Sequence, residues 1–158
     1  MDRDTFARRA SALWPGMVRV AACVLRNQSD AEDAAAQAVL RCYERLPSLR
    51  REESLEAWMM RTCVNQARTL LRRRGRFVLR DEWPEEAADA PKEGPALMPL
   101  LMRLKQKDRL VLVLMYYENQ TVDEIARVLG VPRGTAASRI ARARKRLRAL
   151  WEEEAYDE

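Results

Sequence analysis

The last segment of the chain, from about Arg133 to Trp151, carries apolar residues at intervals of four, three, four and three. This spacing places them along one face of an α-helix, where they can form a single buried stripe. The stripe consists of Ala136, Ile140, Ala143, Leu147 and Leu150. Helix-forming residues such as Ala, Leu, Arg and Glu also dominate the rest of the chain. We therefore expect an all-α protein.

The 158 residues can bury a real core, but this length does not distinguish one domain from two small ones. Apolar residues make up 47% of the chain, which is typical of an ordered protein. The longest apolar run, Leu110 to Tyr117, is far shorter than the ~20 residues of a membrane-spanning helix, and the N-terminus has no apolar signal core. We expect a cytoplasmic protein with no membrane insertion.

Several enzyme classes are excluded by the residues that the chain lacks. It has no histidine, which removes Ser-His-Asp and Cys-His nucleophile pairs, and no glycine-rich phosphate loop. Cys23, Cys42 and Cys63 form no C-x-x-C pair, so we expect buried reduced thiols rather than a zinc site. We expect no metal and no cofactor. An enzyme that uses carboxylates alone is the least favoured alternative.

The charge is divided into blocks, although the net charge is only +5. The first basic block contains Arg68, Arg72, Arg73, Arg74, Arg76 and Arg80. An acidic segment with Pro84, Pro91, Gly94 and Pro95 follows and has no apolar period, so residues 81–96 are expected to form a flexible acidic linker. It separates two expected small helical domains, residues 1–80 and 97–154. About sixteen residues span at most ~55 Å, so these domains can sit apart on a larger partner.

Local signals place the helices within each domain. In the first, we expect a short helix from Phe6 to Leu13, a second with Pro15 in its first turn, a third capped by Ser29, and a long fourth capped by Ser54.

In the second domain, Asp108 is the expected cap of an apolar helix. Thr121 and Glu124 form a predicted capping box for the following helix, and Gly130 ends it.

The two last helices, joined by Leu-Gly-Val-Pro, match a helix-turn-helix. Off the apolar stripe, Arg133, Ser138 and Arg142 could reach base edges in a major groove. The remaining arginines suit phosphates: Arg139, Arg144, Arg146 and Arg148. The alternative is a solvated helix face, which explains poorly why no acid occurs from Pro132 to Ala149.

The Arg68 to Arg80 block is open to the same two interpretations, a solvated face or a track for a DNA strand. Trp58, which precedes it, is expected to belong to the core more than to a stacking platform.

The sequence resembles the extracytoplasmic-function (ECF) bacterial sigma factors, the small two-domain promoter-recognition subunits of RNA polymerase. "EIARVLGVPRGTAASRIARARKRLR" is close to the family's E-I-A-x-x-L-G-x-P-x-G-T-V-K-S-R-x-x-R-A-R-x-x-L. In the first domain, "DAEDAAAQAVL" and "EAWMMRTCVNQARTLLRRR" resemble D-A-E-D-x-x-Q-E-x-F and W-L-x-x-I-A-x-N-x-x-x-D-x-L-R-R. Ala136 and Ala137 stand where the family usually has Val-Lys, and Thr69 stands where it commonly has Asp. We therefore expect individual promoter and polymerase contacts to differ from those of the family.

The resemblance implies a role for each part of the chain. It implies that Asp30, Asp33 and Gln37 bind the clamp helices of the largest polymerase subunit. It also implies that the second domain binds the flap of the polymerase. Minus-ten binding and melting falls to Arg50, Arg51, Arg61, Asn65, Arg68 and Arg72. Minus-thirty-five binding falls to Arg133, Thr135, Ser138, Arg139, Arg142, Arg144 and Lys145. The implied partners are core RNA polymerase, promoter DNA and an anti-sigma factor.

A different function remains open from the residues alone. A free-standing helix-turn-helix repressor could use its first domain to dimerise or to sense a ligand, and it would bind a palindrome unaided. A sigma factor would instead need the polymerase core.

Overall fold

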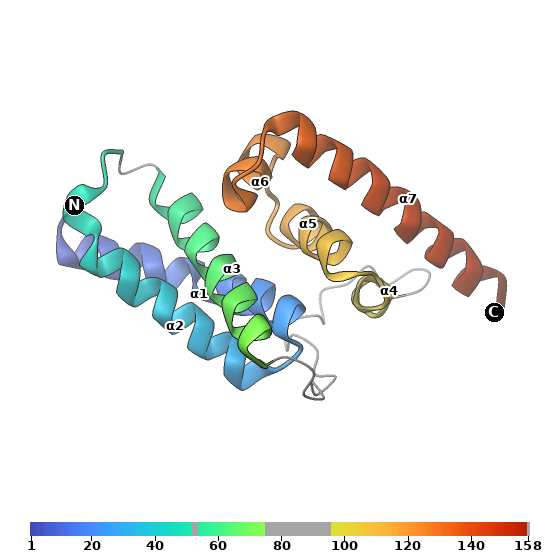
Figure 1. Ribbon diagram of the computed structural model, residues 1–158, viewed down its shortest axis with the longest axis horizontal. Coiled ribbons are helices and arrows are strands. Elements are labelled where there is room, and N and C mark those ends of the chain that lie inside the picture. The colour runs from blue at the N-terminus through green and yellow to red at the C-terminus, as the bar shows by residue number, and fades with distance from the viewer. Residues whose placement is uncertain (52–53, 75–95, 158) are drawn as a thin grey trace.

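The computed structural model describes residues 1–51, 54–74 and 96–157, and the regular structure in these ranges is helical throughout. The first group of helices contains α1 (Arg3–Leu25), α2 (Gln28–Glu44), the short 3-10 helix η1 (Leu46–Ser48) and α3 (Leu55–Arg74). The second group contains α4 (Leu97–Arg103), α5 (Gln106–Tyr116), α6 (Val122–Leu129) and α7 (Arg133–Asp157). Figure 1 shows the two groups side by side, with α5 between the first group and α7. The predicted all-α fold class is confirmed. Arg76, Arg80 and all but the last residue of the expected linker lie outside the described residues.

α1 is one continuous helix, so the predicted break before Pro15 is wrong. A proline inside a helix removes one backbone hydrogen bond, here the one that would end on the carbonyl of Ser11. Both residues are exposed, so water can reach this carbonyl. Phe6 on one side and Met17 on the other are buried in the same core. Tertiary packing therefore overrides the local break signal.

The predicted cap of α2 is also displaced. Asn27, not Ser29, caps the helix, because its side chain accepts a hydrogen bond from the Asp30 N–H at 3.0 Å. Arg26 adopts a left-handed conformation with a φ of 54° and ends α1 at once, which leaves Asn27 extended in the capping position. This short reversal makes α1 and α2 an antiparallel pair, and α3 packs against both.

Asp108 does not cap α5 as predicted. The residue before α5 is Lys105, which makes no side-chain cap bond, and Asp108 lies inside the first helical turn. There it is buried. A buried carboxylate needs a charged or hydrogen-bonding partner, which Asp108 finds in Arg146 of α7. The prediction failed because this partner lies on a different helix.

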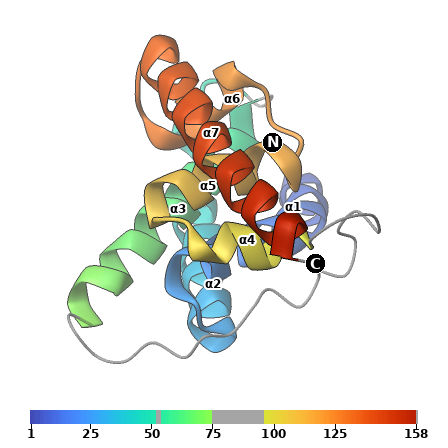
Figure 2. The same cartoon turned by 90° about the vertical axis from the view of Figure 1, so that its right-hand side faces the viewer.

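The C-terminal end of α1 and the middle of α5 are buried on every side. Each residue from Val20 to Leu25 is buried, and so is each residue from Asp108 to Leu114. A helix presents all of its faces within one turn, so such runs need neighbours all around. α2 and α3 cover α1 on one side and α5 covers it on another, while α6 and α7 cover the rest of α5 (Figure 2). The two groups thereby share one continuous hydrophobic core.

All three cysteines are buried free thiols, as predicted. Burial raises the pKa of the Cys23 and Cys63 thiols to about 12, which keeps them protonated and unreactive in the folded protein. Within the described ranges, no helix combines the length and the apolar character needed to cross a membrane.

The predicted capping box of α6 is confirmed. The Glu124 N–H donates to the Thr121 hydroxyl at 3.2 Å, and the Thr121 N–H donates to the Glu124 carboxylate at 3.1 Å. These two bonds satisfy backbone donors that α6 itself cannot satisfy. They define where the helix-turn-helix begins.

Thr121→Ala should lower the free energy of unfolding by about 1 kcal/mol, because it removes the hydroxyl that accepts the Glu124 N–H. Thr121→Ser keeps that hydroxyl and is the matched control, with a much smaller loss. Chemical denaturation of the three proteins measures the difference. Equal stability of the Ala and Ser variants would show that the capping box contributes nothing.

Candidate nucleic-acid interface

α6 and α7 form the predicted helix-turn-helix. Gly130 ends α6 in a left-handed conformation with a φ of 68°, which glycine adopts without strain. The Val131 N–H donates to the Ala126 carbonyl at 3.0 Å and closes the turn. α7 then begins at Arg133. The turn thus sets α7 as the second helix of the motif, the one that enters a major groove in such proteins.

α7 has one buried face and one exposed face. The predicted stripe of Ala136, Ile140, Ala143 and Leu147 is buried against α5 and α6, and Leu150 is half-buried. Six of the predicted DNA-binding side chains are exposed on the rest of the helix: Arg133, Thr135, Ser138, Arg142, Arg144 and Lys145. Arg139 is half-buried. The apolar stripe therefore turns a basic face away from the core.

Arg133 has a neighbour within the motif. Its Nε lies 2.9 Å from Asp123 Oδ1 of α6, and the two side chains are 68% and 62% exposed. An ion pair in this environment contributes little to stability. Arg133 can therefore leave Asp123 for DNA at small cost.

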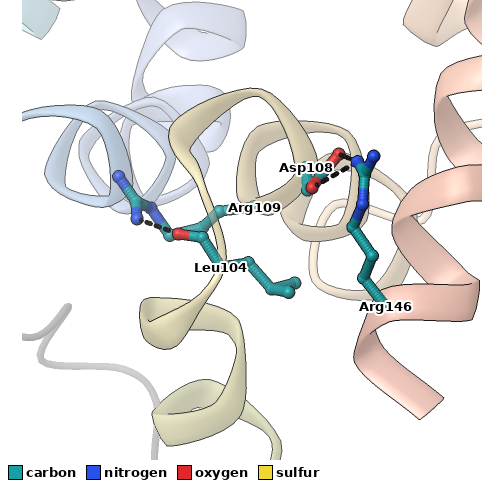
Figure 3. Close-up of polar contacts among 4 residues, drawn as sticks. All are labelled: Leu104, Asp108, Arg109 and Arg146. Atoms are coloured by element: carbon teal, nitrogen blue, oxygen red, sulfur yellow. Dashed lines mark hydrogen bonds and ion pairs between the residues drawn. The ribbon is translucent and has the colours of Figure 1, made fainter. Parts of the chain in front are cut away.

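Arg146 forms an ion pair with a residue of α5. Its Nη1 lies 2.9 Å and 2.8 Å from the two carboxylate oxygens of Asp108, whose side chain is only 8% exposed (Figure 3). Because a buried carboxylate is costly without a partner, this pair fixes α7 against the start of α5. The side chain of Arg146 is nevertheless 56% exposed, so the predicted phosphate contact at Arg146 stays a prediction.

Arg109, the next residue of α5, links the two groups of helices. It is buried, and its Nε donates to the Cys23 carbonyl of α1 at 2.6 Å. Its Nη1 donates to the Leu104 carbonyl at 2.9 Å (Figure 3). Carbonyls in the last turn of a helix have no partner inside the helix, and a basic side chain satisfies them well. Arg109 thus caps α1 from the second group.

The predicted minus-ten residues of α3 form one stripe. Arg61, Asn65, Arg68 and Arg72 are spaced four, three and four apart, and all but Arg68 are exposed. Burial lowers the pKa of the half-buried Arg68, and the nearby charges of Arg139 and Arg72 lower it further. Because Arg139 belongs to α7, the structure brings the two predicted DNA-binding surfaces together.

Arg50 and Arg51 lie in the loop that follows η1, and both are exposed. They precede α3 along the chain, which keeps them at the same end of the first group as the start of that helix.

A cavity of about 280 Å³ lies between the end of α2 and α3. Its lining combines three arginines, an aromatic ring and amides: Arg41, Cys42, Arg45, Trp58, Arg61, Thr62, Asn65 and Gln66. Trp58 is half-buried, so it is neither fully in the core nor a free stacking surface. Arg41 and Arg45 were not among the predicted site residues. Arg41 in the last turn of α2 and Arg45 directly after it are four positions apart, and this spacing was the available signal.

The predicted docking residues share a second cavity, of about 380 Å³, with the end of α3. It is lined by Asp30, Asp33, Ala34, Gln37, Arg41, Gln66, Thr69, Leu70 and Arg73. Asp33 and Gln37 are exposed, while Asp30 forms an ion pair with Arg74. The three residues therefore lie on one surface of α2, and Asp30 is partly neutralised there.

Residues 11–77 match the family "Sigma-70 region 2", and residues 96–147 match "Sigma-70, region 4". The ECF RNA polymerase sigma factor SigM of Mycobacterium tuberculosis is 34% identical over 136 residues, which cover 84% of this chain and 69% of SigM. The ECF RNA polymerase sigma factor SigW of Bacillus subtilis is 25% identical over 93% of this chain and 89% of SigW.

Two solved structures have the same fold. The sigma factor RpoE in complex with the anti-sigma factor NepR from Bartonella quintana superposes with a TM-score of 0.74 at 20% identity, covering 94% of this chain and 97% of that one. CnrH in complex with the cytosolic domain of CnrY gives a TM-score of 0.71 at 23% identity, covering 97% and 91%. Both likenesses extend over the two groups of helices.

Arg146→Ala should lower the free energy of unfolding by about 1–3 kcal/mol, because it leaves the buried Asp108 without its partner. Arg148→Ala is the matched control: this exposed arginine should leave stability unchanged and lower the salt dependence of DNA binding by about one phosphate contact. Denaturant unfolding and DNA binding at two salt concentrations separate the roles. An unchanged stability with a lower salt dependence for Arg146→Ala would make it a phosphate contact after all.

Proposed function

The chain belongs to the family of ECF RNA polymerase sigma factors, and we propose that it binds core RNA polymerase and directs promoter-specific DNA binding, melting and transcription initiation. The observation that carries this proposal is the order of two matched regions. Region 2 covers most of α1 to α3, and region 4 covers the helix-turn-helix. A free-standing repressor would account for the second region only.

In this proposal the first domain, residues 1–80, docks on the clamp helices of the largest polymerase subunit. Asp33 and Gln37 are exposed on α2 and available to a partner. Asp30 would join them once Arg74 is displaced or shared. A polar docking surface of this kind suits an interface that must form and dissociate in each round of initiation.

The minus-ten element would lie across the loop of residues 46–54 and the α3 stripe. The 280 Å³ cavity beside this stripe is at the lower end of the range for small-ligand sites, so it is of a size for one extruded base. Trp58 offers a ring for stacking, and Asn65 offers an amide for a base edge. Arg50, Arg51, Arg61, Arg68 and Arg72 would carry the strand's phosphates.

The minus-thirty-five element would be read by α7, within a second domain of residues 97–154 that also meets the flap. Arg133, Ser138 and Arg142, which are exposed on α7, would contact base edges. Thr135, Arg139, Arg144 and Lys145 would contact the backbone. This division assigns specificity and affinity to different residues that alternate along the first half of α7.

We further expect an anti-sigma factor as a partner, because one of the matched structures is a sigma factor bound to one. The protein would act in the cytoplasm with the polymerase and would catalyse no reaction of its own. Cofractionation with RNA polymerase in cell extracts checks this location.

Addition of the protein to purified core RNA polymerase should produce specific initiation from a cognate promoter. Core polymerase alone and the Asp33→Ala/Gln37→Ala double variant are the controls, and the variant should bind core polymerase more weakly. Failure to bind core polymerase, combined with tight unaided binding to a palindrome, would support the repressor instead.

Arg142→Ala should cost about 1–3 kcal/mol in holoenzyme binding to the cognate minus-thirty-five element, and much less on an element altered at the contacted base. The measurement is binding to a set of single-base promoter variants. Equal losses on every variant would make Arg142 a phosphate contact and pass the base-reading role to Arg133 or Ser138.

A further inference from the structure

Arg133 is the first residue of α7, a position that local chemistry disfavours for a basic side chain. The backbone N–H groups at the start of a helix carry partial positive charge, so an acid stabilises this end and a base destabilises it. The first turn of α7 contains no acid. Asp123 of α6 supplies the missing negative charge, because its Oδ1 lies 2.9 Å from Arg133 Nε. This ion pair joins the two helices of the helix-turn-helix.

Asp123 forms this pair although a nearer partner in the sequence is available. Arg127 lies four positions further along α6 and is exposed, and acids and bases at that spacing commonly pair on a helix surface. Within the described part of the chain, however, the ion pair of Asp123 is with Arg133 and not with Arg127. The pair that depends on the turn thus prevails over the pair along the helix.

The contact with Asp123 is on one side of the Arg133 guanidinium. Nε, the nitrogen closest to the aliphatic stem, is the atom beside the carboxylate. The two Nη groups form the far end, and they have no hydrogen-bond partner among the described residues. A guanidinium presented by this end offers two parallel N–H donors. Such a pair of donors matches O6 and N7 of guanine, which are both acceptors in the major groove.

The start of α7 is also where the motif reaches base edges. In helix-turn-helix proteins, the N-terminal residues of the second helix contact the bases. In the free protein, Arg133 and Asp123 are 68% and 62% exposed, so their pair is solvated and contributes little to stability. DNA displaces this water, and a charge pair becomes stronger as the local dielectric constant falls. The effect of Asp123 on Arg133 therefore belongs mainly to the DNA-bound state.

The carboxylate changes which DNA groups Arg133 prefers. An arginine without an acidic neighbour is attracted to phosphates at any sequence. Asp123 offsets this charge and so weakens the sequence-independent attraction. The contact of both Nη groups with guanine, in contrast, leaves the Nε side of the guanidinium to Asp123. Because specificity is a difference between affinities, weaker binding to the wrong sequences raises it.

We propose that Asp123 is a positioning residue that directs Arg133 to a guanine in the minus-thirty-five element. Asp123 acts through Arg133 and needs no base contact of its own. The inference rests on the proposed sigma function and deepens it, since it names the base and a second residue for the same site. The alternative is that Asp123 only compensates the charge at the start of α7. That role would affect folding and leave base preference unchanged.

The experiment uses the holoenzyme and a minus-thirty-five element that the wild-type holoenzyme selects from random duplexes. Binding is measured on all single-base-pair variants of this element at two salt concentrations. Arg133→Ala should abolish discrimination at one G·C pair. Asp123→Asn should reduce the preference for guanine at that same pair about tenfold. It should also raise the salt dependence by about one phosphate contact, because Arg133 is released to the backbone. Asp123→Glu keeps the charge and should retain most of the preference.

Glu153→Gln is the matched control. It removes an exposed acid from the far end of the same helix and should leave the guanine preference unchanged. Asp123→Asn added to Arg133→Ala should change the preference no further, because residues that act as a unit are not additive. Denaturant unfolding of Asp123→Asn should give a midpoint close to the wild type, since both partners of the pair are exposed.

An unchanged guanine preference in Asp123→Asn would overturn the inference. An equal loss of binding on every variant, with the same salt dependence, would overturn it too and leave Asp123 its role at the helix end. Loss of discrimination at an A·T pair in Arg133→Ala would rule out the guanine contact. In these three cases the wild-type holoenzyme still selects an element, so the sigma function stands. A wild-type holoenzyme that selects no element would instead overturn the sigma function, and the inference with it.

Discussion

The contact between α1 and α5 is the interaction on which the rest of the structure depends. Both helices carry unbroken runs of buried residues, and each packs against the other as well as against helices of its own group. Apolar surface left open to water is costly, so the two groups of helices complete one core together. Arg109 is buried at this contact, although an arginine is costly to bury. Its guanidinium donates to backbone carbonyls that would otherwise lack a hydrogen-bond partner there.

The same contact gives the protein its functional constraint. A closed chain is stable because α1 and α5 cover each other, yet a promoter needs two surfaces held far apart. A partner that separates the two groups of helices would have to offset the lost apolar contact with contacts of its own. A large polymerase with separate docking surfaces for the two domains can do so, whereas a short DNA duplex with one binding site cannot.

Much of the fold could be predicted from the sequence, because helices and caps depend on residues three or four positions apart. The stripe of α7, the capping box at Thr121 and the turn at Gly130 are of this kind. The features that decide the closed state are not local. Arg109 and Cys23 are 86 residues apart, and Arg19 and Glu118 are 99 apart. A glycine at position 16 does not reveal which distant residue lies against its backbone. Asp108 was mistaken for a cap for the same reason, since its partner Arg146 lies 38 residues away.

The most direct measurement is the distance between spin labels on the two domains, by double electron–electron resonance. Ala12→Cys on α1 and Ala149→Cys on α7 replace exposed residues, whereas the native cysteines are buried and react slowly. The free protein should give one narrow distance distribution. Binding to core polymerase and promoter should replace it with a distribution longer by tens of ångströms, on the order of the separation between the promoter elements. A broad distribution in the free protein, or an unchanged distance in the promoter complex, would contradict a closed chain that opens to initiate transcription.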